Sequence, residues 1–323
     1  MSVSRPSGKP LVTVVTLTYK KFDRLFDTIK SVEDQDYPEI EYVIADDGSP
    51  DFPKDEIQQF LCDSKLKSYL ILDSSENRGT VKNINNAYRR SHGDYLINLS
   101  CGDVFCAKDV VSKIVNCFLT KEADVLVTSR IMYSGNYSPV CYLPHIRDRK
   151  TIESWNTPNK QYKAFITSSF LNMASGSAMY FSRTVMEKMG YFDEKYVLWE
   201  DGPFIAKYLK ESKIDTAYDI VSTWYESEGV SNSKMHPLLY KDTVRFNNTD
   251  KMERYKTFGY WDRQKIIYRN KSLECQSAKE RLALKFLFFP VFCYFFVLWL
   301  KDKMGNNDDQ KHIRKSGVRF SAN

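Results

Sequence analysis

Apolar residues come in short runs along most of the chain, and amphipathic stretches separate these runs. Residues 11–18 form a β-branched run that is long enough for a buried parallel strand. Apolar positions then recur at helical spacing from Phe22 to Val32, and Pro38 prevents the helix from continuing, because proline disfavours helical backbone in the residue before it. A second strand is expected at residues 40–45. Together these elements predict a right-handed βαβ unit.

The same alternation continues through the next part of the chain. Further helices are expected at residues 57–66, 81–90 and 110–119. Further strands are expected at residues 68–72, 95–99 and 124–128. This alternation predicts an α/β fold, namely a doubly wound, mostly parallel sheet with flanking helices.

Residues 133–165 break the pattern with a stretch that is rich in Tyr, Pro, Asn and Lys. We expect a long irregular insert here, of the kind that is usually functional or mobile. Regular elements return as a strand at 178–181 and helices at 185–189 and 204–209. Residues 223–231 then close the globular part, so one domain is expected over residues 1–235.

A helical C-terminal region is expected over residues 236–323, with an apolar segment at 282–300. Its longest part without a charged residue, 286–300, would span about 22 Å as a helix, against about 30 Å for a bilayer core. Pro290 lies within this part, and basic residues flank both ends. These features predict a membrane-associating segment that lies in one interface. A buried core helix, an oligomer interface and a membrane-spanning segment are the alternatives.

The bulk composition narrows the possible partners and compartment. A formal net charge of +6 suits anionic lipid or phosphate-bearing ligands and is too weak to indicate nucleic acid. The seven cysteines follow no disulfide or zinc-finger pattern, which favours a reducing compartment. The polar N-terminus lacks the apolar core of a secretion signal.

Candidate chemistry begins where the strand at 95–99 ends. The next residues are small, namely Ser100, Cys101 and Gly102, and they let a ligand approach the backbone closely. Asp103 then stands at the carboxyl end of a central strand, where open α/β sheets place their ligands. Its carboxylate can hold a divalent cation, which in turn can hold phosphates. The alternative is an ordinary turn with a solvated carboxylate.

Four motifs follow one another in a meaningful order. They are VVTLTY at 14–19, ADDGS at 45–49, NRG at 77–79 with GDY at 93–95, and GYFD at 190–193 followed by Glu200 and Asp201. With this set, residues 11–231 resemble the family 2 glycosyltransferases of the GT-A fold. The resemblance implies a metal-dependent hexosyltransferase. Such an enzyme moves a sugar, with inversion, from a nucleotide-sugar, in particular a UDP-sugar, to a hydroxyl of a saccharide acceptor.

The resemblance also implies which residues bind the donor. Asp47 can accept a hydrogen bond from uracil or ribose, and Tyr19 can pack on the base. Asp46 and Asp47 also suit turn and cap chemistry, and we expect at least one of them to do both. The other positions that the resemblance assigns to the donor are Thr18, Asn77, Gly79, Lys82, Asn85, Ser100, Cys101, Gly102, Ser175 and Gly176.

Asp103 is the metal ligand that the resemblance implies, for Mn²⁺ or Mg²⁺. Here the chain departs from the family, because Ser100 and Gly102 occupy the usual Asp-x-Asp positions. One carboxylate can suffice, since such cations often keep waters and substrate phosphates as ligands. In a second departure, Ile84 stands where many relatives carry Arg, and Lys82 could supply a substitute charge or simply be solvated.

Asp201 matches the family's catalytic base, with Glu200 as the second candidate. Alternatively, both residues merely cap the following helix. Two other functions stay open: a non-catalytic sugar-nucleotide-binding protein, and a nucleotidyltransferase, although no glycine-rich loop follows the first strand. Together with the apolar tail, the resemblance implies attachment to the cytoplasmic side of a membrane. It also implies a polyprenyl-linked acceptor used in bacterial surface-polysaccharide synthesis.

Overall fold

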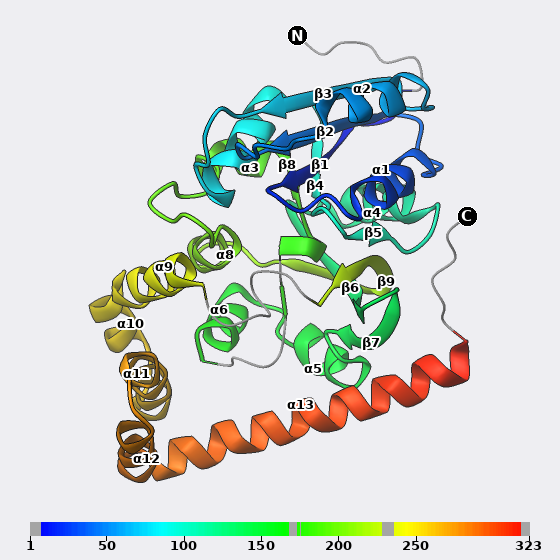
Figure 1. Ribbon diagram of the computed structural model, residues 1–323. Coiled ribbons are helices and arrows are strands. Elements are labelled where there is room, and N and C mark those ends of the chain that lie inside the picture. The colour runs from blue at the N-terminus through cyan, green and yellow to red at the C-terminus, as the bar shows by residue number, and fades with distance from the viewer. Residues whose placement is uncertain (1–7, 168–172, 175, 228–235, 318–323) are drawn as a thin grey trace.

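A mixed nine-stranded sheet is the centre of the computed structural model, which describes residues 8–167, 173–174, 176–227 and 236–317. The strand order is β3-β2-β1-β4-β8-β6-β9-β5, and β7 pairs with β6. Helices pack against the sheet, and one long C-terminal helix runs along the base of the molecule (Figure 1).

The N-terminal half of the sheet is parallel. Its strands are β1 (Val12–Thr18), β2 (Ile40–Asp46), β3 (Ser68–Asp73) and β4 (Tyr95–Asn98). Its helices are α1 (Leu25–Glu33), α2 (Lys54–Cys62) and α3 (Thr80–Arg90). Every residue of β2 is buried, as expected for a parallel strand that is covered on both faces. In the register, Thr18 pairs with Asp46 and Asp46 with Asp73, so β1, β2 and β3 end at one edge of the sheet. The predicted βαβ unit is confirmed.

The other half of the sheet is mixed, because β8 (Met179–Ser182) runs antiparallel to both β4 and β6. The other elements of this half are β5 (Val104–Phe105), α4 (Val110–Lys121), β6 (Val125–Ser134), α7 (Arg183–Met189), α8 (Asp201–Tyr208) and β9 (Asp215–Glu226). The α/β class with flanking helices is therefore confirmed, but the sheet is less parallel than predicted. A buried strand has the same apolar pattern in either direction, so the pattern does not reveal the reversal.

The prediction of an irregular insert at residues 133–165 is wrong, because this part of the chain has regular structure. Its elements are β7 (Ser138–Leu143), η1 (Ile146–Asp148), α5 (Arg149–Glu153) and α6 (Pro158–Thr167). A tight hairpin joins β6 to β7, with Gly135 and Tyr137 in left-handed backbone (φ 55° and 52°). These elements are short, so they offer few periodic apolar positions by which a sequence pattern could identify them.

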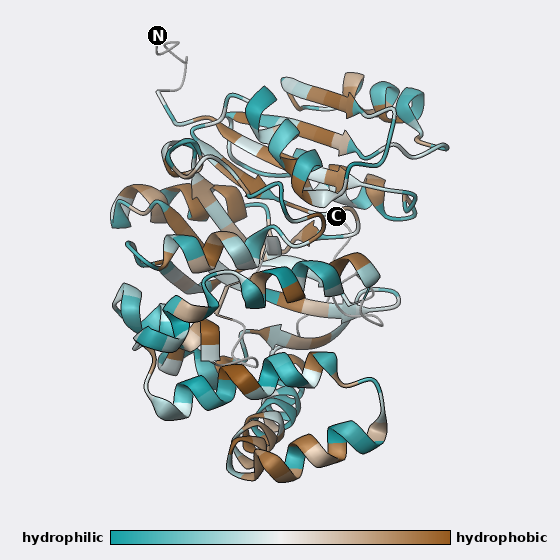
Figure 2. Cartoon of the chain, turned by 90° about the vertical axis from the view of Figure 1, so that its left-hand side faces the viewer, coloured by the Kyte–Doolittle hydropathy of each residue, from teal (hydrophilic) through white to brown (hydrophobic). Residues whose placement is uncertain are grey.

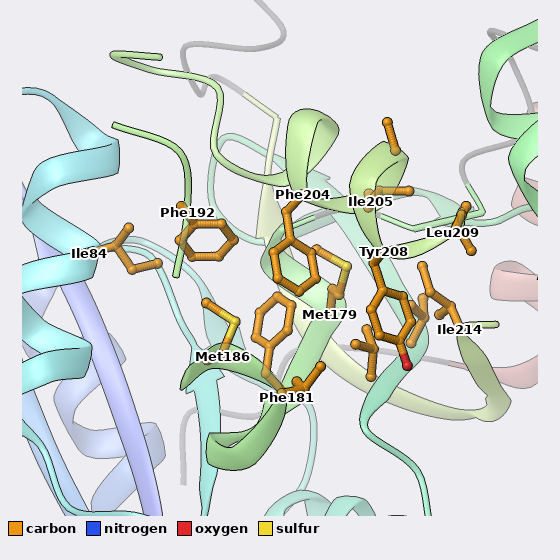
Figure 3. Close-up of a cluster of buried hydrophobic side chains, with 14 of the residues drawn as sticks. Ile84, Met179, Phe181, Met186, Phe192, Phe204, Ile205, Tyr208, Leu209 and Ile214 are labelled. Atoms are coloured by element: carbon orange, nitrogen blue, oxygen red, sulfur yellow. The ribbon is translucent and has the colours of Figure 1, made fainter. Parts of the chain in front are cut away.

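An aromatic cluster fixes the start of α8 against the sheet. Phe181 of β8, Phe204 of α8 and Phe192 of the preceding loop pack edge to face, with ring centroids 5.1–5.7 Å apart (Figure 3). All three side chains are buried. Edge-to-face pairs of this kind stabilise one arrangement of the rings. The cluster therefore determines where the first residues of α8, Asp201 among them, lie relative to the sheet.

The C-terminal region consists of helices. They are α9 (Pro237–Asn248), α10 (Lys251–Thr257), α11 (Tyr260–Glu274), α12 (Ala278–Leu287) and α13 (Phe289–Ser316). Within the described ranges, none of the helices is by itself long and apolar enough to cross a membrane; α12 and α13 pass that test only as a pair, with a bend of 106° between them. Figure 2 shows hydrophobic residues on α12 and at the start of α13, at the bottom of the view. The domain boundary at residue 235 stays a prediction.

Candidate active site

The turns that follow β2 and β3 are held together by Asp47. Its carboxylate accepts hydrogen bonds from the backbone N–H groups of Arg78 (2.9 Å) and Gly79 (2.8 Å), at the start of α3. Tyr19, which is 42% exposed, lies beside them, and hydrogen bonds from Lys20 and Asn77 lower its pKa. The structure thus brings together Tyr19, Asp47, Asn77 and Gly79, which the sequence placed in three separate motifs.

Asp46 and Thr18 have a structural role in this arrangement. The buried Asp46 carboxylate accepts hydrogen bonds from the Thr18 hydroxyl (2.8 Å) and from the backbone N–H and hydroxyl of Ser49 (2.6 and 2.8 Å). The turn chemistry expected of the two aspartates is therefore confirmed for both. Next to this turn lies a polar cleft of about 310 Å³, whose lining includes Asp73, Arg78 and Arg90. A cleft of this size can hold part of a polar ligand.

Asp103 occupies a tight turn between β4 and β5. Gly102 has a φ of +95°, and a Cβ atom there would lie 2.8 Å from the Glu226 carboxylate, so this position requires glycine. Tyr133 fixes the turn by donating a hydrogen bond to the Gly102 carbonyl (2.6 Å). Ser100 and Cys101 belong to the same turn, with Ser100 exposed at its start. The backbone therefore holds the Asp103 carboxylate in one place.

One carboxylate oxygen of Asp103 is available for a ligand. Its Oδ1 atom accepts the backbone N–H of Glu226 (3.0 Å), whereas among the described residues no group donates to its buried Oδ2 atom. Burial, together with the Glu226 charge, raises the Asp103 pKa to about 7, and the charge of Arg130 opposes this shift. A buried oxygen of this kind fits a divalent cation.

The described residues contain no group of three or more His, Cys, Asp or Glu side chains that could hold a metal ion. Asp103 would therefore hold a cation with few other protein ligands, and substrate phosphates and waters would have to complete the coordination. The role of Asp103 as a metal ligand stays a prediction.

Glu200 and Asp201 lie side by side at the start of α8. The backbone N–H of Gly176 donates to Asp201 Oδ2 (2.9 Å), and a Cβ atom at Gly176 would lie 2.9 Å from the Glu200 carboxylate. Burial and the Asp201 charge raise the Glu200 pKa to about 8. Burial raises the Asp201 pKa as well, but the N–H groups of Gly176 and Gly202 oppose that shift. Burial therefore makes both carboxylates harder to ionise, and the N–H groups that Asp201 accepts favour its ionised form.

Arg130 is a residue of this site that the sequence interpretation missed. It lies on β6, is only 6% exposed, donates a hydrogen bond to the Ser177 hydroxyl and has its guanidinium 4.2 Å from the centre of the Tyr225 ring. Ser177 follows Gly176, whose N–H binds Asp201, and Tyr225 precedes Glu226, whose N–H binds Asp103, so Arg130 contacts the chain next to both carboxylates. Its charge lowers the pKa of both. Little in the sequence marks it, because the polar Thr128 and Ser129 precede it and the expected strand ended at residue 128.

Two predicted donor residues have contacts with the loop before α8. The buried Asn85 amide donates to the Phe192 carbonyl (2.9 Å) and accepts the Phe192 N–H (3.1 Å), so it holds the loop before α8 rather than facing a ligand. Lys82 is exposed, and its charge lowers the pKa of Glu194 in the same loop. Its expected role beside a diphosphate stays a prediction. Ser175 lies outside the described residues.

Comparison with known sequences identifies one family. The model of the family described as glycosyl transferase family 2 matches residues 13–190. TuaG of Bacillus subtilis (strain 168), a glycosyltransferase assigned to teichuronic acid biosynthesis, is 29% identical over 146 residues, which are 45% of this chain and 56% of TuaG. The uncharacterized glycosyltransferase alr2836 of Nostoc sp. (strain PCC 7120) is 25% identical over 228 residues, 68% of this chain and 66% of alr2836. The chain thus spans just over half of TuaG and two thirds of alr2836.

Two solved structures illustrate the likeness in fold. Residues 1–349 of Staphylococcus aureus TarS, in complex with UDP-GlcNAc, align with a TM-score of 0.60 at 16% identity, over 87% of this chain and 81% of that one. The mannosyltransferase PcManGT from Pyrobaculum calidifontis, in complex with GDP-Man and Mn²⁺, aligns with a TM-score of 0.56 at 15% identity, over 93% and 86%. At such identities the likeness shows the fold alone, which is GT-A-like.

Proposed function

The chain belongs to glycosyl transferase family 2, and we propose that it transfers a sugar, with inversion, from a UDP-sugar to a hydroxyl group of a saccharide acceptor. The observation that carries this proposal is the arrangement around Arg130, which contacts Ser177 and Tyr225, the neighbours of the residues whose N–H groups bind Asp201 and Asp103. The reaction needs a positive charge where the leaving group becomes negative, and a base that accepts the proton of the acceptor hydroxyl.

In the proposed reaction, Asp201 takes the proton of the acceptor hydroxyl as its oxygen bonds to the anomeric carbon. The bond from that carbon to the diphosphate oxygen breaks, and its electron pair leaves with the nucleoside diphosphate. The Gly176 N–H holds the Asp201 carboxylate in position throughout. Asp103, with its free Oδ2 atom, would hold the divalent cation, Mn²⁺ or Mg²⁺, which when bound neutralises charge on the diphosphate.

We assign the donor's nucleotide to the turns around Asp47 and to the polar cleft beside them. The UDP-GlcNAc complex of TarS supports a uridine nucleotide, and the GDP-Man complex of PcManGT is the reason to test a guanosine nucleotide as well. The assignment of TuaG to teichuronic acid biosynthesis supports an acceptor in an anionic cell-surface polysaccharide. The exposed apolar residues of α12 and α13 support a polyprenyl-linked acceptor at the cytoplasmic face of a membrane.

A panel of UDP-sugars and GDP-Man tests the proposal, with and without Mn²⁺, on polyprenyl-linked saccharide acceptors. We expect one donor to be consumed in an acceptor- and metal-dependent reaction. We expect Asp201→Asn to slow it by about 100-fold or more, while UDP binding stays unchanged. Donor binding that raises the melting temperature, without turnover on any acceptor, would instead favour the non-catalytic sugar-nucleotide-binding protein.

A further inference from the structure

One carboxylate of the C-terminal helices reaches the backbone next to the candidate base. Asp242 of α9 is only 2% exposed, and its Oδ2 atom accepts hydrogen bonds from three successive backbone N–H groups. They belong to Val197 (2.9 Å), Leu198 (2.7 Å) and Trp199 (3.1 Å), the three residues directly before Glu200 and Asp201. Bonds from N–H groups to an ionised acceptor are roughly twice as strong as those between neutral groups.

The first of these three residues also contacts the start of α3, next to the turns around Asp47. The carbonyl of Val197 accepts the N–H of Val81 in the first turn of α3 (3.1 Å), and the Val197 side chain and carbonyl lie against Gly79. Gly79 is in turn bound by the Asp47 carboxylate. A continuous set of contacts thus runs from the turns around Asp47, through residues 197–199, to α9.

Side-chain packing adds to this hold. The ring of Trp199 packs on Phe246 of α9, with centroids 5.0 Å apart, and covers the backbone of Gly202. The Trp199 side chain also hydrogen-bonds Asp201 and thereby lowers its pKa. The backbone that Asp242 fixes therefore carries a direct partner of the candidate base.

We propose that Asp242 is a positioning residue for the transfer reaction, which holds residues 197–199 so that Asp201 is aimed at the acceptor hydroxyl. This proposal rests on the proposed function of Asp201. Asp242 does not touch the substrate, and its effect passes through the backbone. A displacement of a reacting group by about 1 Å can cost about 100-fold in rate, so the loss of three backbone contacts at this point should reduce kcat.

Two substitutions at Asp242 and one matched control test the proposal. Asp242→Ala removes the acceptor, whereas Asp242→Asn keeps one oxygen that can accept. The control is Asp309→Ala in α13, because Asp309 is equally buried and also accepts backbone N–H groups, those of Tyr142 and Ile146, far from α8 along the chain. All proteins are assayed with the full chain, at a temperature at which each is folded.

We expect Asp242→Ala to lower kcat roughly 10- to 100-fold with unchanged UDP affinity, Asp242→Asn to retain more of kcat, and Asp309→Ala to leave kcat near that of the wild type. Equal losses of kcat in the Asp242→Ala and Asp309→Ala variants would overturn the proposal, as would a loss of UDP affinity in step with kcat.

Hydrogen exchange gives a readout that does not depend on activity. The amides of residues 197–199 should exchange faster in Asp242→Asn than in the wild type, with no change there in Asp309→Ala. Unchanged protection of these amides would overturn the proposal even if kcat falls. If the wild type transfers no sugar while the amides lose protection as expected, the proposed function fails and the positioning of this segment stands.

Discussion

At the scale of single residues, the site contains carboxylates whose pKa values are raised by burial. Asp103 and Glu200 both have pKa values raised by burial, to about 7 and about 8. Arg130 opposes this effect at Asp103 and Asp201. A carboxylate that titrates near neutral pH is suited to exchange protons or to bind a cation under ordinary conditions.

Asp103→Asn tests the proposed cation site. The amide keeps the shape of the side chain and its contact with Glu226 but loses the charge that would bind Mn²⁺. We expect kcat to fall about 100-fold or more, with little change in the melting temperature without metal. In the wild type, Mn²⁺ should raise the melting temperature in the presence of UDP, and in the variant it should not. Near-normal turnover of the variant at low Mn²⁺ would show that Asp103 is not the ligand.

Glu200→Gln tests the coupling of the two carboxylates at α8. The Asp201 charge raises the Glu200 pKa, and by reciprocity a Glu200 charge disfavours ionisation of Asp201. Glu200 carries its charge only above a pH of about 8, and a glutamine never carries it. We therefore expect any change of kcat near pH 8, measured at saturating Mn²⁺ and donor, to disappear in the variant, while the acid limb stays in place. A change near pH 8 that persists in the variant would contradict the assignment of this pKa to Glu200.

At the scale of elements, the second half of α13 is part of the N-terminal fold. The Asp309 carboxylate is buried and accepts hydrogen bonds from the N–H groups of Tyr142 (3.0 Å) and Ile146 (3.2 Å). It also binds the Nδ1 atom of His145 (2.6 Å), whose ring packs against Gly305. Ile313, one turn further, belongs to the apolar cluster that contains Val104 and Trp224. α13 thus packs on β7 and on the segment that follows it.

His145 makes this contact sensitive to pH. Its hydrogen bonds with Asp302 and Asp309 outweigh the opposing effect of burial and raise its pKa from 6.5 to about 9. Because the folded protein binds this proton more tightly than the unfolded chain, the stabilisation is complete below pH 6.5 and is lost as the pH rises through about 9. We expect the melting temperature to fall over this range, and to fall less in Asp309→Ala.

Asp309→Ala itself should lower the free energy of unfolding by about 3 kcal/mol, because it removes one of the two carboxylate partners of the buried His145 and the acceptor of two backbone N–H groups. Asp308→Ala is the matched control, since Asp308 is 54% exposed and pairs with Arg147 at the surface. A surface pair contributes about 1 kcal/mol at most. Denaturant titrations of both variants at pH 6.5 check the difference, and equal losses would mean that the His145 contact is not a stabilising one.

At the scale of the whole molecule, α12 and the first half of α13 form an elbow at its base (Figure 1). Large apolar side chains are exposed there, among them Phe286 and Leu287 (72% each), Phe289 (58%) and Trp299 (42%). Exposed basic residues accompany them, namely Lys279, Arg281, Lys285, Lys301 and Lys303. An apolar surface with basic neighbours favours an anionic bilayer, and the other half of α13 is fixed to the N-terminal fold.

Flotation with vesicles tests this attachment. We expect the full chain to float with vesicles that contain anionic lipid, and less so at high salt. Replacing Phe286 and Leu287 by serine should weaken this binding by about 100-fold or more, because each buried side chain contributes about 1.5–3 kcal/mol. Leu119→Ser is the control, since Leu119 is 54% exposed on α4, away from the elbow. Wild-type protein that does not float, or equal binding by the control and the double variant, would refute the attachment.

The sequence by itself determined the alternating elements and the places where their chemistry lies. Buried parallel strands are continuous apolar runs, and the turns after them carry small and acidic residues, so both can be recognised locally. This is why the family resemblance, the turns around Asp47 and Asp103, and the Glu200–Asp201 pair could be identified, and the family is confirmed. The metal, the acceptor and the membrane stay predictions.

Only the tertiary structure decided which residues support those positions. Asp242 binds residues 45 positions before it, and Asp309 binds His145 over 164 positions. Nothing in the local sequence marks either aspartate, because an exposed and a buried carboxylate on a helix follow the same pattern until their partners are known. The same holds for Arg130, which contacts Ser177 and Tyr225 from distant segments, and for Asn85, whose partner is the backbone of Phe192. Contacts over such distances depend on how the chain folds back, which local periodicity does not encode.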